Sequence, residues 1–226
     1  ISSNSATIVI EKIMMALQIG AWRVGHQNSW LLITKEIIMR YLRVFFGAII
    51  LLASIAAWAA FEITPSVQKE LDQAAEAVKG WAADPVIVNA VAAQNQKGPI
   101  AGMDNAKWKS VRRSDALIKE FQSNDAAQWL KQKLDASQGL YSEAFLNANQ
   151  GEKVAFVAKT SSYLHKGSAK FEKPFTTGQT WQGEPEFDES SQTHQIQISA
   201  PVLADGKPIG VLVVGVNLTK LAELSK

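Results

Sequence analysis

The chain has 226 residues, enough for one domain with additions, and it contains no cysteine. A disulfide framework, a thiolate metal site and a cysteine nucleophile are therefore excluded. Residues 61–226 hold eighteen Lys/Arg against nineteen Asp/Glu, so this part lacks the excess of positive charge that nucleic-acid binding requires.

The strongest compositional feature is an apolar segment at residues 39–61. None of residues 44–61 is charged, and this length is close to the roughly 20 apolar residues that cross a bilayer. Arg40 and Arg43 precede the apolar run, an arrangement that favours a cytoplasmic N-terminus and export of the chain beyond the run. The small residues of Ala57–Ala59 fit a signal peptidase site. We predict either a cleaved signal peptide or an uncleaved membrane anchor, rather than a buried core helix, which usually carries polar positions.

Residues 1–38 precede this segment and give no functional signal. Met39 begins the basic-then-apolar order that is typical of a signal peptide. We therefore predict that the natural protein begins at Met39 and that residues 1–38 are an extension.

Residues 62–138 follow a helical pattern. Thr64 is suitable as an N-cap, and Pro85 should end the first helix and begin a second one that runs to about Gln96. Residues 106–137 predict one or two short amphipathic helices, in which we expect the apolar positions, Trp129 among them, to be buried. The apolar residues at helical spacing in the first helix, which we expect to be buried, are Val67, Leu71, Ala74, Ala75, Val78 and Trp81.

Residues 139–226 change to the two-residue period of strands. We predict five strands, with a short helix at residues 168–175 between the second and the third. The strands cover residues 140–148, 153–160, 179–190, 193–204 and 207–218, and a short tail comes after them.

The fourth strand alternates most clearly, since Ile196 and Ile198 point to one face and Gln197 to the other. Asp205-Gly206 is the tight-turn signal that joins it to the fifth strand. Strands joined by tight turns pair antiparallel. We therefore expect an α+β domain in which a long N-terminal helix precedes a five-stranded antiparallel sheet with helices against one face.

Residues 185–202 contain acidic, hydroxyl and histidine side chains close together in the sequence. Such a stretch suggests either a catalytic or metal-binding loop, or two strands joined by a turn. We favour strand, turn and strand, with the turn at residues 188–193. Asp188, Ser190 and Ser191 suit a turn because their side chains can bond nearby backbone groups.

A catalytic site would need a nucleophile or a metal together with an oriented base. The exported part has only His165 and His194, and neither has a second ligand at metal-binding spacing. A triad of a serine with His165 and Asp188 is conceivable, as it is in any chain of this size. We therefore expect no enzyme activity, no metal and no cofactor.

Three motifs succeed one another in the last third of the chain: "TSSYLHKGSAKF" at residues 160–171, "DESS" at 188–191 and "GKPIGV" at 206–211. They resemble the "TSDYWQGDEAKW" type segment, the "DEST" turn and the "GKPIGA" hairpin of small exported bacterial proteins with a single Cache (PDC) domain, an extracytoplasmic PAS-like sensor domain. The resemblance extends in organisation over residues 64–221 and is specific over residues 159–221.

The chain departs from the family pattern within the first motif. Ser162 stands where the family has Asp, and Leu164-His165 stand where it has Trp-Gln. Part of an acidic pair is replaced within residues 167–169. If the ligand contacts these positions, its identity would differ from that of the relatives' ligands.

The resemblance implies a PAS-like five-stranded antiparallel sheet with a helical cover, and a ligand pocket between the two. The residues at matching positions are Trp129, Tyr163, Lys170, Phe171, Trp181, Glu186 and Gln197. Lys170 would meet a carboxylate through charge-assisted hydrogen bonds, and Trp181 and Tyr163 would frame a flat or aliphatic body. Taken singly, each is more readily a surface lysine or a core aromatic than a pocket residue, and only the set indicates a pocket.

We therefore expect a sensor-type domain in the bacterial periplasm, exported or anchored to the inner membrane by residues 41–61. It would bind a small carboxylate or amino acid and, having no output module of its own, signal through a membrane sensor partner or a homodimer along residues 65–96. The alternative is an exported structural or protein-interaction scaffold whose pocket is filled by Tyr163, Phe171 and Trp181.

Overall fold

The computed structural model describes residues 63–188 and 193–224 of the chain. The predicted extension at residues 1–38, the signal or anchor at residues 39–61 and the centre of the turn at residues 188–193 lie outside these residues. In the part that is described, no helix is long and apolar enough to cross a membrane.

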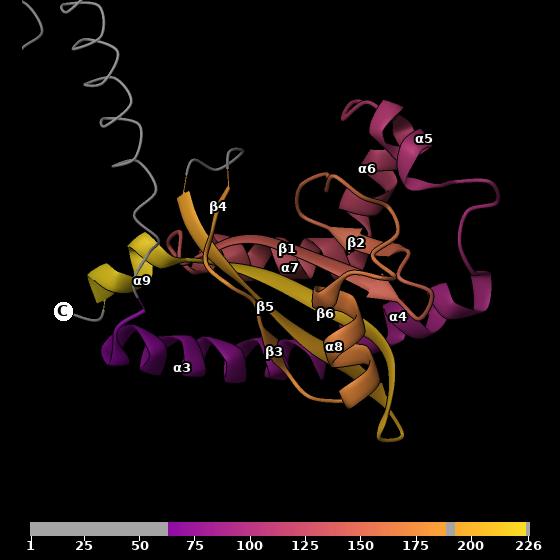
Figure 1. The fold of residues 1–226 in the computed structure, drawn as a ribbon. Coiled ribbons are helices and arrows are strands. Elements are labelled where there is room, and N and C mark those ends of the chain that lie inside the picture. The colour runs from indigo at the N-terminus through magenta and orange to yellow at the C-terminus, as the bar shows by residue number, and fades with distance from the viewer. Residues whose placement is uncertain (1–62, 189–192, 225–226) are drawn as a thin grey trace, which may run out of the picture. The chain divides into compact units, whose positions relative to one another are not determined.

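Five helices come first in the described chain (Figure 1). They are α3 (Pro65–Ala82), α4 (Pro85–Lys97), α5 (Asn105–Ser110), α6 (Ala116–Ser123) and α7 (Asp125–Ala136). The Thr64 side chain accepts a hydrogen bond from the Val67 amide and caps α3 as predicted. The prediction of one or two helices over residues 106–137 was wrong, because three helices lie there, and the Asp104 and Asn124 side chains cap the first and the third.

The sheet has six strands in five positions. They are β1 (Tyr141–Ala148), β2 (Lys153–Phe156), β3 (Trp181–Gln182), β4 (Glu186–Asp188), β5 (Thr193–Ala204) and β6 (Lys207–Asn217). The order is β2-β1-β6-β5-β3, every pair is antiparallel, and β4 also pairs with β5. The predicted third strand is therefore split in two, since Pro185 lies between its halves and has no N–H for the ladder.

Local sequence signals determine where the strands turn and where the last strand ends. Asp205 and Gly206 have φ values of 50° and 75°, so both central residues of the β5–β6 turn are left-handed, as a tight hairpin turn requires. The pairing of Asp188 with Thr193 agrees with the predicted strand, turn and strand. The expected tail is a helix, α9 (Leu218–Leu224), which begins where the Asn217 side chain accepts from the Lys220 amide.

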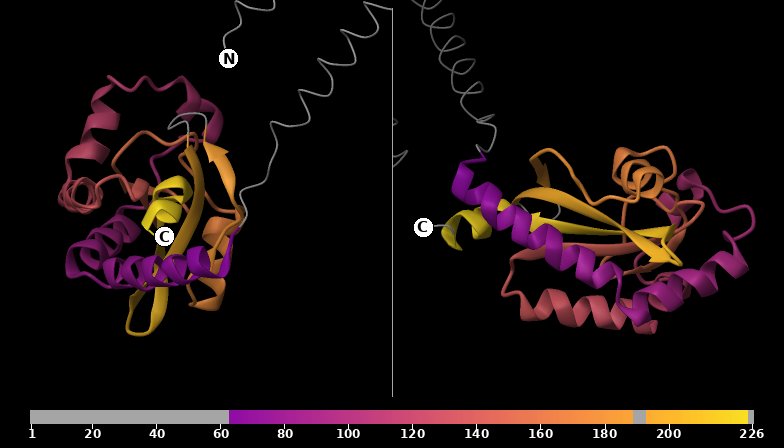
Figure 2. Two further views of the ribbon diagram at one scale, coloured as in Figure 1. Left: turned by 90° about the vertical axis from the view of Figure 1, so that its left-hand side faces the viewer. Right: turned by 90° about the horizontal axis from the view of Figure 1, so that it is seen from below.

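Helices cover both faces of the sheet, and the expectation of helices against one face was wrong. Helices α3, α4, α7 and α9 pack against the first face, and α8 (Ala169–Thr177) packs against the second face over β5 and β6 (Figure 2). Strands β5 and β6 are buried on both sides for this reason. The strand residues that form the first-face core are Ala144, Leu146, Ile196, Ile198, Ala200, Leu212, Val214 and Val216.

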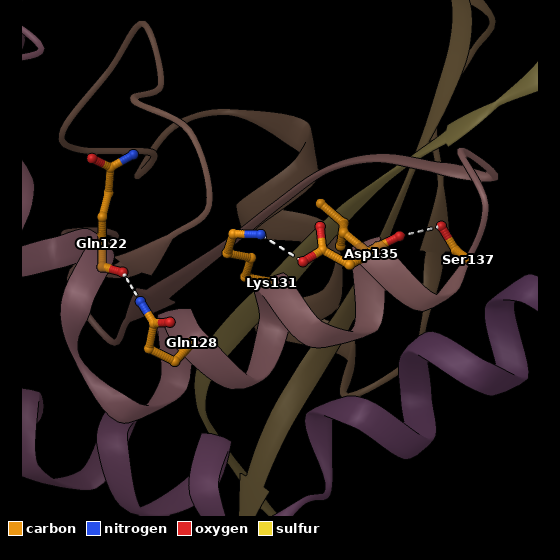
Figure 3. A network of polar contacts seen from close by, with 6 residues as sticks. Gln122, Gln128, Lys131, Asp135 and Ser137 are labelled. Carbon is orange, nitrogen blue, oxygen red and sulfur yellow. Dashed lines mark hydrogen bonds and ion pairs between the residues drawn. The ribbon is translucent and has the colours of Figure 1, made fainter.

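The outer surface of α7 carries ordinary polar contacts. Lys131 pairs with Asp135 at 2.5 Å, and the Gln128 side chain donates to the Gln122 carbonyl oxygen at 2.8 Å (Figure 3). Exposed pairs of this kind contribute little to stability. Lys131 is therefore a suitable control position, on the opposite side of the sheet from the candidate site.

Candidate ligand-binding face

The second face of the sheet carries buried polar side chains where a core would ordinarily be apolar. The alternation of β5 that sends Ile196 and Ile198 to the first-face core sends Gln195, Gln197 and Ser199 to the other side. All three are buried. We call this second side, with the side chains of β1 and β2 that share it, the polar face.

The acidic end of the polar face is organised around Glu143. Its Oε1 accepts from Gln197 Nε2 at 2.7 Å and from Gln195 Nε2 at 3.3 Å. The Ser142 hydroxyl donates to Gln195 Oε1 at 2.7 Å, and Gln195 Nε2 also lies 3.4 Å from Glu186 Oε1. These bonds hold Glu143 across the sheet toward β5.

Gly215 makes this network sterically possible. It lies on β6 between Gln197 and Glu143 in the strand register. A Cβ atom at Gly215 would lie 2.7 Å from Glu143 Cγ and 2.8 Å from Gln195 Oε1. A residue with any side chain here would displace the polar groups that cross β6.

The basic end is built around Lys153, the first residue of β2, which is fully buried. Its Nζ donates to Asn147 Oδ1 at 3.0 Å and lies 3.1 Å from His165 Nδ1. The same nitrogen lies 3.7 Å from the centroid of the Phe145 ring. The His165 ring packs against the Phe145 ring at 4.9 Å.

Burial sets the protonation of this pair. Burial lowers the pKa of Lys153 well below 10.5, the nearby Glu143 charge acts to raise it, and the Lys170 charge lowers it further. Burial, with the charges of Lys153 and Lys170, lowers the pKa of His165 to about 2. His165 is therefore neutral at physiological pH, and its Nδ1 shares a hydrogen bond with the Lys153 amine.

Between the two ends lies an unpartnered hydroxyl. Ser199 Oγ is buried and has no hydrogen-bond partner in the structure. It is opposite Val213 on one side and Trp181 on the other. Leaving such a group unbonded costs about 1–3 kcal/mol, so this position favours a ligand or water that would supply the missing bond.

The cover over the polar face is closely packed. Tyr163 is fully buried, lies 5.5 Å from the Trp108 ring, and its hydroxyl accepts from the Ile100 amide at 2.9 Å. Phe171 of α8 is buried and stacks on Phe175 at 5.0 Å. These aromatic side chains form the core on this side.

The structure brings six of the seven predicted site residues to one side of the sheet. Trp181, Glu186 and Gln197 lie on the strands, and Tyr163, Lys170 and Phe171 lie in the cover. Trp129 is not among them. It lies on α7 against the first face, with its ring 6.2 Å from Trp81.

Sequence reasoning missed Lys153 and Glu143. A lysine at the start of a strand, two residues after the "NQG" turn, is normally a solvated residue. The signal that could have marked Lys153 is that the residues after it, Val154 to Phe156, are all apolar and so buried on both sides.

A separate hollow of about 420 Å³ lies between α4 and α7. None of the predicted site residues lines it. Its Asn124 side chain already donates to the Val154 carbonyl and accepts from the Ala127 amide. We place the candidate site on the polar face because the unpartnered hydroxyl of Ser199 and the buried Lys153, which forms no ion pair among the described residues, are there.

No family model matches the chain, and no curated protein matches it. Several solved structures do match the chain. The ligand-binding domain of the Pseudomonas aeruginosa PAO1 amino acid chemoreceptor PctC in complex with GABA is 16% identical, with a TM-score of 0.43. The match covers 70% of this chain and 58% of that one.

Two further solved structures are similar. The sensory domain of the Campylobacter jejuni chemoreceptor Tlp3 with isoleucine bound is 16% identical over 73% of this chain and 68% of that one, with a TM-score of 0.38. The V. cholerae histidine kinase DctB sensor domain is 19% identical over 69% and 56%, with a TM-score of 0.34.

These matched structures are Cache/PDC-type sensor domains, the type that residues 159–221 resemble. The chain spans less than two thirds of the Pseudomonas and V. cholerae domains. At these identities and TM-scores the likeness concerns fold alone, so ligand and partner are argued from this chain's own geometry.

Proposed function

We propose that this chain is an extracytoplasmic sensor domain that binds a small carboxylate or amino acid on its polar face. One observation carries the proposal: a buried face has basic groups at one end, a carboxylate at the other, and an unpartnered hydroxyl between them. Ligand sites generally combine an apolar surface with a few placed polar groups of this kind.

Each part of the ligand has a partner in this arrangement. A carboxylate would lie at the basic end, near Lys153 and Lys170, where charge-assisted hydrogen bonds are strongest. An ammonium or amide N–H would lie toward Glu143. The Ser199 hydroxyl would bond the ligand between them, and the half-buried Trp181 ring would contact its apolar part.

Binding requires movement of the cover. Tyr163 and Phe171 occupy the space above the sheet in this structure, so residues 163–175 would have to shift to admit a ligand and close over it. A partner protein, such as a membrane sensor, would then read the closed form. A homodimer formed along residues 65–96 is a second way to transmit the movement of the cover. The bacterial periplasm is the expected site of action.

The alternative of an exported interaction scaffold has a specific observation in its favour. Tyr163 and Phe171, two of the three aromatics that were expected to fill the pocket of such a scaffold, are fully buried. The third, Trp181, is partly exposed. The scaffold would bind a protein and no small ligand.

The chemistry around His165 favours binding over catalysis. Its ring nitrogen meets the Lys153 amine, and its ring meets Phe145. A catalytic triad would instead place a hydroxyl and a carboxylate at its two nitrogens.

The test is a thermal-shift screen of the full chain against amino acids, short carboxylates and amines. A ligand at one hundred times its dissociation constant adds about 2.7 kcal/mol to the stability of the folded state. A sensor domain should give a clear shift with at least one compound, retained in Lys131→Ala and reduced in Lys170→Ala. A cooperative unfolding transition that no compound shifts would favour the scaffold.

A further inference from the structure

Lys153 is a buried amine that takes part in no ion pair of the described residues. Its hydrogen-bonding partners, Asn147 and His165, are both neutral. A buried ammonium without an ion-pair partner is costly, and a protein can avoid this cost by holding the amine neutral.

The charged and titratable groups around Lys153 come from every element that packs near it. From β1, Glu143 contributes a carboxylate that already accepts from two glutamine amides. From the segment before α8, His165 contributes a neutral ring, and from α8, Lys170 contributes a second positive charge. From the turn before β2, Glu152 is a further buried carboxyl group, whose pKa burial raises and whose Oε1 has no hydrogen-bond partner. None of these carboxyl groups forms an ion pair with Lys153.

We infer that Lys153 receives the carboxylate of the ligand and takes up one proton from solvent as the carboxylate arrives. This inference rests on the proposed function. The step is Lys–NH₂ + H⁺ + RCOO⁻ giving a Lys–NH₃⁺ that is ion-paired to RCOO⁻, so charge and protons balance. No covalent bond forms.

The physical reason is the change of environment at one nitrogen. In the structure, burial and the Lys170 charge lower the pKa of Lys153. A carboxylate at hydrogen-bonding distance favours the charged amine and raises that pKa. His165 does not take the proton instead, because burial is the main cause that holds its pKa at about 2 and the Lys170 charge also lowers it.

Because proton uptake is coupled to ligand binding, the affinity for the ligand should depend on pH. Between the titration midpoints of the free and the bound forms, the bound form holds one more proton than the free form. Affinity should then fall by about tenfold per unit rise of pH within that interval. Lys153→Met, which keeps the length and removes the amine, should bind more weakly and lose this pH dependence.

The direct test observes the Lys153 amine by NMR. The full chain, labelled at the lysine side chains, is titrated with pH in excess sodium acetate and in sodium chloride of equal ionic strength. Lys153 is assigned from Lys153→Met or, if that variant does not fold, from the shift caused by the Phe145 ring. We expect a depressed midpoint in chloride and a higher one in acetate, with Lys131 unchanged.

Two results would overturn the inference: an ordinary Lys153 midpoint in chloride, or the same midpoint in both salts. A different result decides the proposed function. If a compound from the thermal-shift screen binds wild type and Lys153→Met equally well, the proposed function stands and this inference falls. If acetate has no effect and no compound of the screen binds, both fall.

Discussion

Glu143 on β1 accepts a hydrogen bond from Gln197 on β5 at 2.7 Å, although β6 lies between these two strands. Side chains of strands two positions apart ordinarily cannot meet, because the residue of the middle strand stands between them. At this register position the middle residue is Gly215. The acidic end of the polar face therefore depends on the absence of a side chain at Gly215.

Gly215→Ala should destabilise the protein by about 1–3 kcal/mol, as inserting a methyl group into a packed site generally does. The new Cβ would meet Glu143 Cγ and Ser142 Oγ at 2.7 Å. Gly80→Ala is the matched control, because a Cβ at Gly80 of α3 has nothing within 4 Å. That control should be neutral or stabilising by up to about 1 kcal/mol. Urea unfolding of both variants checks this, and equal effects would contradict it.

His165 should make stability depend on pH. Its folded-state pKa is lowered from 6.5 to about 2, so the unfolded chain binds the proton first as pH falls. Folding stability should then decrease as pH falls from 6.5 toward 2, by at most about 1.4 kcal/mol per pH unit. His165→Gln keeps an acceptor for Lys153 and removes the titration. Urea midpoints at pH 7 and pH 5 should differ less in this variant than in wild type, and an equal difference would argue against a buried neutral histidine.

Ser199→Ala should separate stability from binding. The hydroxyl is buried without a partner, so removing it should leave stability unchanged or raise it by up to about 1 kcal/mol. A ligand that bonds this hydroxyl should bind several-fold more weakly to the variant. The melting temperature, measured with and without a compound that shifts wild type, reports both effects. A loss of stability in the absence of ligand would mean that the hydroxyl has a partner, such as a bound water.

Parts of the fold could be predicted from local signals in the sequence. The caps and prolines of α3 and α4 and the Asp205-Gly206 turn act within a few residues, so their placement could be predicted. The order of the strands in the sheet could not be predicted, because β1 pairs with β6, which lies far from it along the sequence. Non-local pairing leaves no mark in the local residue pattern.

The candidate site was only partly predictable for the same reason. Gln197 could be placed on the polar face from the alternation of its strand. Lys153 could not, because its burial depends on the loop that carries His165 and on α8, which come from later in the chain. The helical period placed Trp129 on the inner side of α7 but carried no information on which face of the sheet α7 covers.

The two tryptophans of the predicted site should therefore behave differently. Trp129 packs against Trp81 on the first face, with the Lys133 ammonium 4.7 Å from its ring. Trp129→Leu should lower stability by about 1–2 kcal/mol through lost contact area and leave the affinity of any bound compound unchanged. Trp181→Leu, at the strand edge beside Ser199, should lower affinity.

Unfolding in urea and titration with a compound from the thermal-shift screen give the two readouts on the same samples. Lys131→Ala, on the outer surface of α7, controls for any substitution in that helix and should change neither. Weaker binding in Trp129→Leu than in Trp181→Leu would place the ligand against the first face, where the hollow between α4 and α7 lies. It would thereby contradict the assignment of the site to the polar face.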